Sequence, residues 1–214
     1  REGGTVAAFR APRLEVNSAQ FFALAELGYL YDTGLEEGLD DSKDGSNYIW
    51  PYTMENGVPN TYTMRRSGYT TVAIDSLPVG TGLWQYPVHN VIVDPQDREA
   101  VFTAYEGIQD AQGIDVSDDR EDWLTHGKIT GFDFNMFILW GMTGDQAYRA
   151  LKYTLDKRLE GNKAPFHLGL HTDYFTPIYD NATLRAPENL NSFGLALQYN
   201  TWEDRKETLQ RFMD

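Results

Sequence analysis

The segment from Pro165 to His171 combines a strand-like pattern with a residue that can exchange protons. Apolar residues alternate with polar or small ones up to Leu170, which is the two-residue period of a pleated strand. The pattern predicts a strand over 165–170, with His171 at its C-terminal end, where ligands collect in open α/β sheets and barrels. A histidine there can act as a general acid or base near pH 7. The alternative is a structural histidine held by hydrogen bonds.

A second histidine, His167, lies four residues before His171. On a helix this spacing can bind zinc. On a strand the two side chains share a face but lie about 13 Å apart, because each residue advances the chain by about 3.3 Å. We therefore expect no joint metal site at this pair.

An arginine at the end of a predicted N-terminal strand is the second candidate for chemistry. The strand covers 5–9 and leads into Arg10, whose guanidinium can hold a carboxylate through two parallel hydrogen bonds. Pro12 restricts the turn and so aims the arginine. The alternative is an ordinary surface arginine.

A strand–helix–strand unit connects Arg10 to Asp32. Asn17 is a good N-cap with Gln20 three residues later, and Gly28 ends the predicted helix before a short strand that finishes at Asp32. Short connections of this kind are typical of parallel α/β sheets. Because parallel strands end at the same edge, we expect Arg10 and Asp32 to lie within ion-pair distance.

The remaining pattern predicts one α/β domain over 1–214. Capped apolar repeats predict three further helices, at 96–109, 144–159 and 202–213. Other segments are predicted to be a loop-rich excursion (34–70), extended chain (71–93), an acidic loop (115–122) and a strand or helix (128–139).

Composition limits the classes of partner. The net charge of −14 repels phosphate backbones, so we expect no nucleic-acid partner, and no long apolar run predicts a membrane span. The absence of cysteine excludes disulfides and thiolate metal sites. High acidity suits an external medium, which favours a secreted or periplasmic location. The chain begins at Arg1 without Met, so we expect residues upstream of it.

Two acidic stretches are candidates for calcium-binding loops. Asp40, Ser42 and Asp44 match the opening half of such a loop, but Pro51 stands where the closing glutamate is expected. A solvated turn is the preferred interpretation, with calcium at these three residues as the alternative. The same weighting applies to the second group, which comprises Asp115, Asp118, Asp119 and Asp122.

Several short motifs occur in an order that resembles a known family. They are Arg10-Ala11-Pro12-Arg13, Leu27-Gly28-Tyr29, Tyr31-Asp32-Thr33, Ala164-Pro165 and Leu170-His171. Over residues 4–33 and 145–175 they resemble the C-terminal half of a polysaccharide deacetylase of the NodB-homology type, carbohydrate esterase family four. The resemblance implies the later part of a distorted (β/α) barrel, a seven-stranded TIM-barrel variant, whose N-terminal strands lie outside this chain.

The resemblance also implies roles for individual residues. His171 would be the general acid for the departing amine, Arg10 would position the catalytic-base aspartate, and Asp32 would steady that arginine. The usual D-x-x-D-W pattern around Asp32 is not reproduced. The implied substrate-binding residues are an apolar residue of the acetyl pocket and aromatic rings of the sugar cleft, namely Leu170, Trp50, Trp84 and Tyr174.

The metal ligands of that family precede its arginine motif. This chain contains no Thr-Phe-Asp-Asp run and no His-(Ser/Thr)-x-x-His run. A divalent metal, zinc by resemblance, is therefore expected on residues upstream of Arg1, and the isolated chain is expected to be inactive.

The implied reaction is hydrolysis of acetyl groups, N-acetyl rather than O-acetyl, from a chitin-like or peptidoglycan-like glycan. The implied partner is the N-terminal half of the same domain. Two alternatives remain open. One is a non-catalytic carbohydrate-binding or pseudoenzyme domain, and the other is a scaffold half that only completes the barrel.

Overall fold

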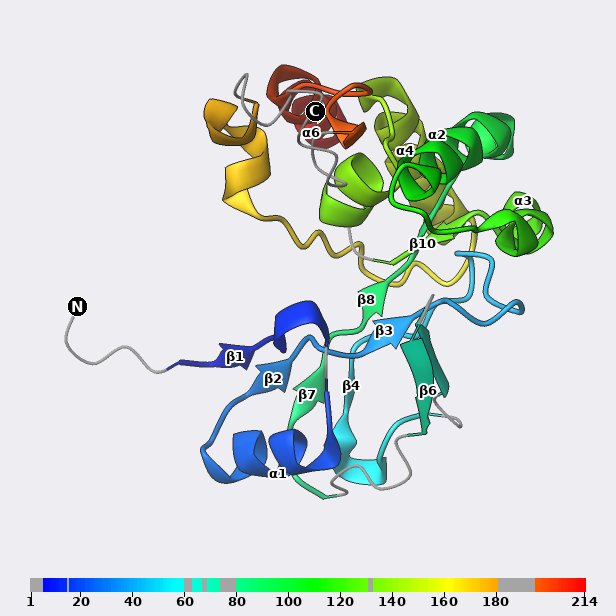
Figure 1. Cartoon of the computed structure of the whole chain (residues 1–214). Helices are drawn as coiled ribbons and strands as arrows, with labels where there is room; N and C mark the ends of the chain where they lie inside the picture. The colour runs from blue at the N-terminus through cyan, green and yellow to red at the C-terminus, as the bar shows by residue number, and fades with distance from the viewer. Residues whose placement is uncertain are drawn as a thin grey trace.

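The computed structural model describes residues 6–14, 16–59, 63–66, 69–73, 80–130, 133–180 and 195–214. Most of its short strands lie in one half of the molecule and its long helices in the other (Figure 1). Between the two halves runs a long extended segment, residues 163–171, which we call the strap. The architecture is therefore mixed α/β, as predicted.

The largest sheet has the strand order β1-β2-β7-β4. Strands β1 (Ala8–Phe9), β2 (Tyr31–Asp32) and β7 (Trp84–Gln85) are parallel, and β4 (Tyr52–Thr53) is antiparallel to β7. Helix α1 (Ser18–Glu26) connects β1 to β2, which confirms the predicted parallel strand–helix–strand unit. Thr5, the first residue of the predicted strand, lies outside the described residues.

Helix α1 has the ends that the sequence predicts. The Asn17 side chain accepts a hydrogen bond from the backbone N–H of Gln20 at 2.9 Å, and Gly28 adopts a left-handed φ of 76° just beyond the helix. The apolar face of α1 packs in a small core against the sheet. Its buried members are Phe21, Leu24, Leu35, Met54 and Leu83.

Three separate strand pairs complete the described sheets. They are β3 (Glu36–Glu37) with β8 (Val88–His89), β9 (Val91–Ile92) with β10 (Lys128–Ile129), and β5 (Thr63–Arg66) with β6 (Tyr69–Ala73). Within the described ranges no barrel closes, because these sheets remain distinct. The predicted excursion at 34–70 is also more regular than expected: it contains β3, β4 and η2 (Met54–Asn56), although 60–62 and 67–68 lie outside the description.

The helical half contains the larger core. Its helices are α2 (Arg98–Asp110), α3 (Arg120–His126), α4 (Gly144–Glu160) and α6 (Trp202–Met213), so the three predicted helices are confirmed. Thr143 and Thr201 form capping boxes at the starts of α4 and α6. None of the helices in the described part is both long and apolar enough to cross a bilayer.

The acidic stretch 115–122 is not a simple loop. Its second half forms η4 (Ser117–Asp119) and the start of α3, because Trp123 is buried and its indole Nε1 donates to Arg98 O at 3.0 Å. Acidic side chains in a first helical turn also face the positive end of the helix dipole. The buried Trp123 anchors the helix, and the acidic residues favour its N-terminus.

The predicted strand over 165–170 is wrong. The strap is extended but pairs with no described strand, and His171 precedes the short helix η6 (Thr172–Phe175). Side chains from elsewhere hold its backbone instead: Arg158 Nη1 donates to Pro165 O at 2.5 Å, and the N–H of His171 donates to Asp133. The ambiguous stretch 128–139 contains both predicted forms, a short strand followed by the π-helix η5 (Phe134–Leu139).

A buried cationic cluster supports the start of the strap. The Arg158 guanidinium lies 5.1 Å from the centroid of the Tyr48 ring and 4.5 Å from that of Phe166, and burial lowers its pKa to about 10. The ring of His89 stacks on Tyr48, with centroids 5.1 Å apart, and His89 Nε2 lies 2.8 Å from Ile49 O. Burial, together with the charge of Arg158, lowers the pKa of His89 to about 3.

Acidification is therefore expected to destabilise the fold through His89. Its folded pKa lies below the unfolded value of 6.5, so the unfolded state binds the proton more tightly. Stability should fall from about pH 6.5 downward, by up to about 1.4 kcal/mol per pH unit for this one proton. Urea midpoints at pH 7 and pH 4 should show a smaller loss for His89→Gln than for the unaltered protein. His126→Gln is the control, and equal losses in all three proteins would contradict the expectation.

Candidate active site

The pair His171–Asp133 is the central feature of the candidate site. Nδ1 of His171 lies 2.9 Å from Oδ1 of Asp133, and the backbone N–H of His171 donates to the other carboxylate oxygen. The Asp133 side chain is only 2% exposed, whereas that of His171 is 69% exposed. A buried carboxylate thus fixes one ring nitrogen and leaves Nε2, on the far side of the ring, available to a substrate.

Asp133 is positioned by the start of the π-helix η5. Its Oδ1 also accepts the backbone N–H of Phe134 at 2.8 Å, while Met136, Phe137 and Ile138 fix the helix in the core. Asp133 is not among the site residues predicted from the sequence. Its position as an acidic residue within an apolar run could have identified it, since a buried carboxylate needs hydrogen-bonding partners.

Arg10 lies on the other side of the strap. It follows β1, and its guanidinium is packed so tightly on Gly169 that an added Cβ would lie 3.0 Å from Cζ and from Nη2. Desolvation lowers the pKa of Arg10, and the charges of Asp133, Asp32 and Glu36 oppose this shift. The charge of Arg10 therefore interacts both with Asp133, the partner of His171, and with Asp32 at the end of β2.

Asp32 lies at the carboxyl end of β2, opposite Phe9 of β1. Its buried Oδ2 accepts the backbone N–H of Gly34 at 2.7 Å, and burial raises its pKa, which the Gly34 hydrogen bond and the charge of Arg10 oppose. Among the described residues, Asp32 and Arg10 form no direct ion pair. The structure brings them to adjacent strand ends, where they interact through space.

The contact between Arg10 and Gly169 leads to a testable prediction for a substitution at Gly169. Gly169→Ala should push the guanidinium away from the strap, because the nearest atoms belong to a movable side-chain end. If Arg10 positions a reacting group, this displacement should lower kcat/KM by about tenfold, since small misplacements of positioned groups are costly. The melting temperature should change little. Gly107→Ala on α2, where an added Cβ would meet only the Tyr199 hydroxyl at 3.8 Å, is the control, and full activity in Gly169→Ala would contradict the expectation.

Leu170 and Tyr174 also lie close to His171. The Tyr174 ring meets the imidazole edge-on, with centroids 5.4 Å apart. Leu170 and Asp133 line one small cavity of about 20 Å³, which has room for a single methyl-sized group. Its remaining walls are mostly apolar and comprise Met136, Phe137, Leu151, Leu168, Phe175, Arg205, Thr208 and Leu209.

The two predicted tryptophans are exposed but separate from His171. Trp84 on β7 is 45% exposed, and Trp50 is 51% exposed with its indole Nε1 donating to Asn162 O at 3.0 Å. Tyr86 lies two residues beyond Trp84 and packs against Tyr31 with centroids 5.1 Å apart. In the part of the chain that is described, no ring contact joins either tryptophan to His171.

The stretch weighed as a calcium loop uses its carboxylates internally. Oδ1 of Asp40 accepts the N–H and Oγ of Ser42, at 2.9 and 2.5 Å, and Asp44 accepts the same pair of bonds from Ser46. These are two successive turns of the kind that Asp and Ser favour. The geometry supports the solvated-turn interpretation.

One group of potential metal ligands occurs in the described ranges. Asp41, Asp122 and His126 place one ligand atom each within 4.8 Å of one another, and both carboxylates are exposed. The ammonium of Lys128 lies among the same acidic residues, donates to Asp40 O and already supplies positive charge. His171 and Asp133 are not members of this group, so the described residues give the candidate active site no set of three metal ligands.

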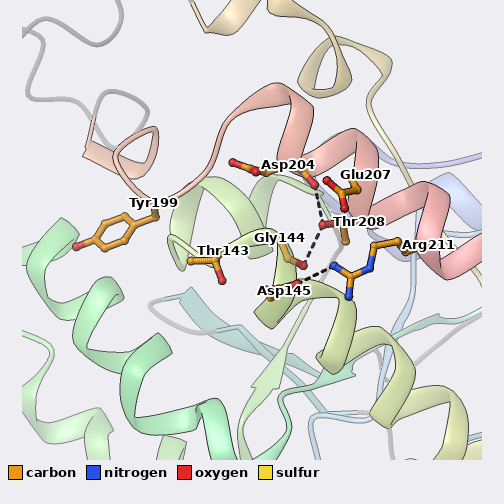
Figure 2. A pocket seen from close by; sticks show the side chains of 8 residues that line it. All are labelled: Thr143, Gly144, Asp145, Tyr199, Asp204, Glu207, Thr208 and Arg211. Carbon is orange, nitrogen blue, oxygen red and sulfur yellow. Dashed lines mark hydrogen bonds and ion pairs between the residues drawn. The ribbon is translucent and has the colours of Figure 1, made fainter.

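A larger pocket of about 370 Å³ lies between α4 and α6 (Figure 2). Several of its polar groups bond one another: Arg211 Nη1 bonds Asp145 at 2.6 Å, and the Thr208 hydroxyl donates to the carbonyls of Gly144 and Asp204. Neither His171 nor Asp133 lines this pocket. We therefore place the candidate site at the His171–Asp133 pair.

No family model, curated protein or solved structure matches the chain. The functional assignment consequently depends on the side-chain geometry and on the motif resemblance.

Proposed function

We propose that the chain supplies the proton-donating part of a hydrolase that removes acetyl groups from a polysaccharide. The single observation that carries this proposal is an exposed His171 whose Nδ1 is held by the buried carboxylate of Asp133. That arrangement is the one by which enzymes fix the tautomer of a histidine acid or base. A purely structural histidine would direct its ring inward.

In the proposed reaction His171 Nε2 gives its proton to the nitrogen of the breaking C–N bond, so that the product leaves as a neutral amine. Asp133 stabilises the protonated ring before transfer and keeps its orientation. Arg10 holds the carboxylate of the residue that accepts the proton of the attacking water. An amine leaving group needs this proton more than an alcohol does, which favours amides over esters.

The described residues around His171 do not form a metal site, since they offer one histidine and carboxylates that are already hydrogen-bonded. By the resemblance, zinc belongs to residues outside this chain. The same missing segment would add strands beyond β1 and complete the distorted barrel. Substrates of the chitin or peptidoglycan type further suggest a secreted or periplasmic enzyme.

The test uses the longer polypeptide with the residues that precede Arg1. Loaded with zinc, it should release acetate from N-acetylated chito-oligosaccharides or peptidoglycan fragments, and the 214-residue chain should not. A longer polypeptide that binds these glycans without releasing acetate would contradict the proposal. Activity only on O-acetylated glycans would contradict the amide preference.

The exposed aromatic rings favour a second candidate, a non-catalytic carbohydrate-binding domain. Trp84, Tyr86 and Trp50 offer flat apolar surfaces of the kind that stack on sugar rings. In that case the 214-residue chain alone would bind oligosaccharide, and Trp84→Ala would abolish binding while His171→Ala would not.

A further inference from the structure

We infer that Arg205 is the positioning residue that fixes the geometry between His171 and Asp133, an inference that rests on the function proposed for this pair. Arg205 lies on α6 and is fully buried. It lines the small cavity beside Asp133. Arg205 would act through hydrogen bonds to the segments that carry His171 and Asp133, and it would not touch the substrate.

The first connection leads to His171. Arg205 Nε donates to Tyr174 O at 2.6 Å, and the N–H of Tyr174 donates to His171 O at 3.2 Å. The guanidinium therefore holds the turn η6 that begins directly at the histidine. Helix α6 also packs against this turn.

The second connection leads to Asp133. Arg205 Nη1 donates to Asn200 Oδ1 at 2.6 Å, and the Asn200 amide in turn donates to Phe137 O and Met142 O at 2.9 and 3.0 Å. Phe137 belongs to η5, the π-helix that Asp133 caps. One buried guanidinium thus joins the two segments that carry the two members of the pair.

The third connection balances the charge. Arg205 Nη2 forms an ion pair with Asp180 Oδ1 at 2.9 Å, and Asp180 also accepts the N–H of Trp202. Three donors of one rigid plane serve three separate segments. Lysine carries the same charge on a single flexible ammonium and cannot reproduce that fork.

The experiment follows the His171 ring by NMR in the 214-residue chain. In the unaltered protein the hydrogen bond to Asp133 should keep the proton on Nδ1 of neutral His171. Arg205→Lys should give a mixture of tautomers. Arg211→Lys, on the same helix and paired with Asp145 at the surface, is the control and should leave the His171 signals unchanged (Figure 2).

A second variant covers the case in which Arg205→Lys does not fold. Asn200→Asp keeps the pairing with Arg205 but removes the N–H donors to Phe137 O in the π-helix and to Met142 O beyond it, so it should also disturb the tautomer. In the complete enzyme both variants should lower kcat about 10–100-fold with little change in KM, as expected for misplaced chemistry.

The outcomes separate this inference from the proposed function. An unchanged His171 tautomer in folded Arg205→Lys or in Asn200→Asp would overturn the positioning role. A changed tautomer in a longer polypeptide that shows no deacetylase activity would support the positioning role and reject the proposed function.

Discussion

His171→Ala is expected to lower kcat of the proposed deacetylase by roughly 10²–10⁴, the usual contribution of a positioned acid. Without the imidazole the departing nitrogen must take its proton from water. KM should change little, because the exposed aromatic rings that would bind the sugar remain. The fold should survive, since the side chain is largely exposed and Asp133 keeps its bonds to two backbone N–H groups.

The measurement is kcat and melting temperature on the same preparation. His171→Gln should behave like the alanine variant, because its amide can bond Asp133 but cannot titrate. His126→Ala, at a surface histidine on α3, is the matched control and should retain full activity. An unchanged kcat in folded His171→Ala would reject the acid role.

Asp133→Asn is expected to reduce both activity and stability. Both carboxylate oxygens accept N–H groups, from His171 and from Phe134, whereas an asparagine presents one oxygen and an NH₂ group. One donor would therefore face another donor in a buried site, at a cost of about 1–3 kcal/mol. The lost charge and the altered ring tautomer should lower kcat by roughly 10²–10⁴.

Urea unfolding and kcat together test this expectation. Asp145→Asn removes the exposed partner of Arg211 and is the control, which should leave the urea midpoint nearly unchanged because solvent screens exposed ion pairs. An Asp133→Asn protein that unfolds at the same urea concentration as the unaltered protein and keeps its kcat would contradict both roles of Asp133. Its buried hydrogen bonds would then not stabilise the fold, and its pairing with His171 would not contribute to the reaction.

Local patterns predicted the helices well because the information lies within a few residues. Asn17, Thr143 and Thr201 each cap the first turn that follows them, and the bonds are those expected from the side chains alone. The parallel unit β1–α1–β2 followed from the same kind of signal, since its connections are short.

The strap shows what a local pattern cannot supply. Alternating leucines suit a pleated strand, but they do not say whether the backbone meets a strand or the side chain of Arg158, and here Leu168 is only partly buried while Leu170 is exposed. The π-helix η5 could not be predicted for a related reason, because its apolar run also suits a strand or an α-helix. In both cases contacts from distant residues decide the form.

The candidate site was predicted in part. Arg10, Asp32 and His171 lie at strand ends or at the end of the strap, and Arg10 contacts Gly169 and interacts through its charge with Asp32 and with Asp133, the partner of His171. Asp133 was missed because it precedes His171 by 38 residues and only the fold makes them partners. Arg205 of α6 bonds the segments that carry both residues, and no short motif indicates those bonds.

The way in which the strap is held also determines which sequence changes the surface beside His171 can tolerate. A strand within a sheet has a fixed register, and one inserted residue turns all its side chains to the opposite face. The strap is instead fixed at separate points, through Pro165 O, Gly169 and the N–H of His171. We expect insertions between the first two points to yield folded proteins where Phe166 and Leu168, which pack against the helical core, are kept. The surface beside His171 could thus be altered while the sheet stays the same.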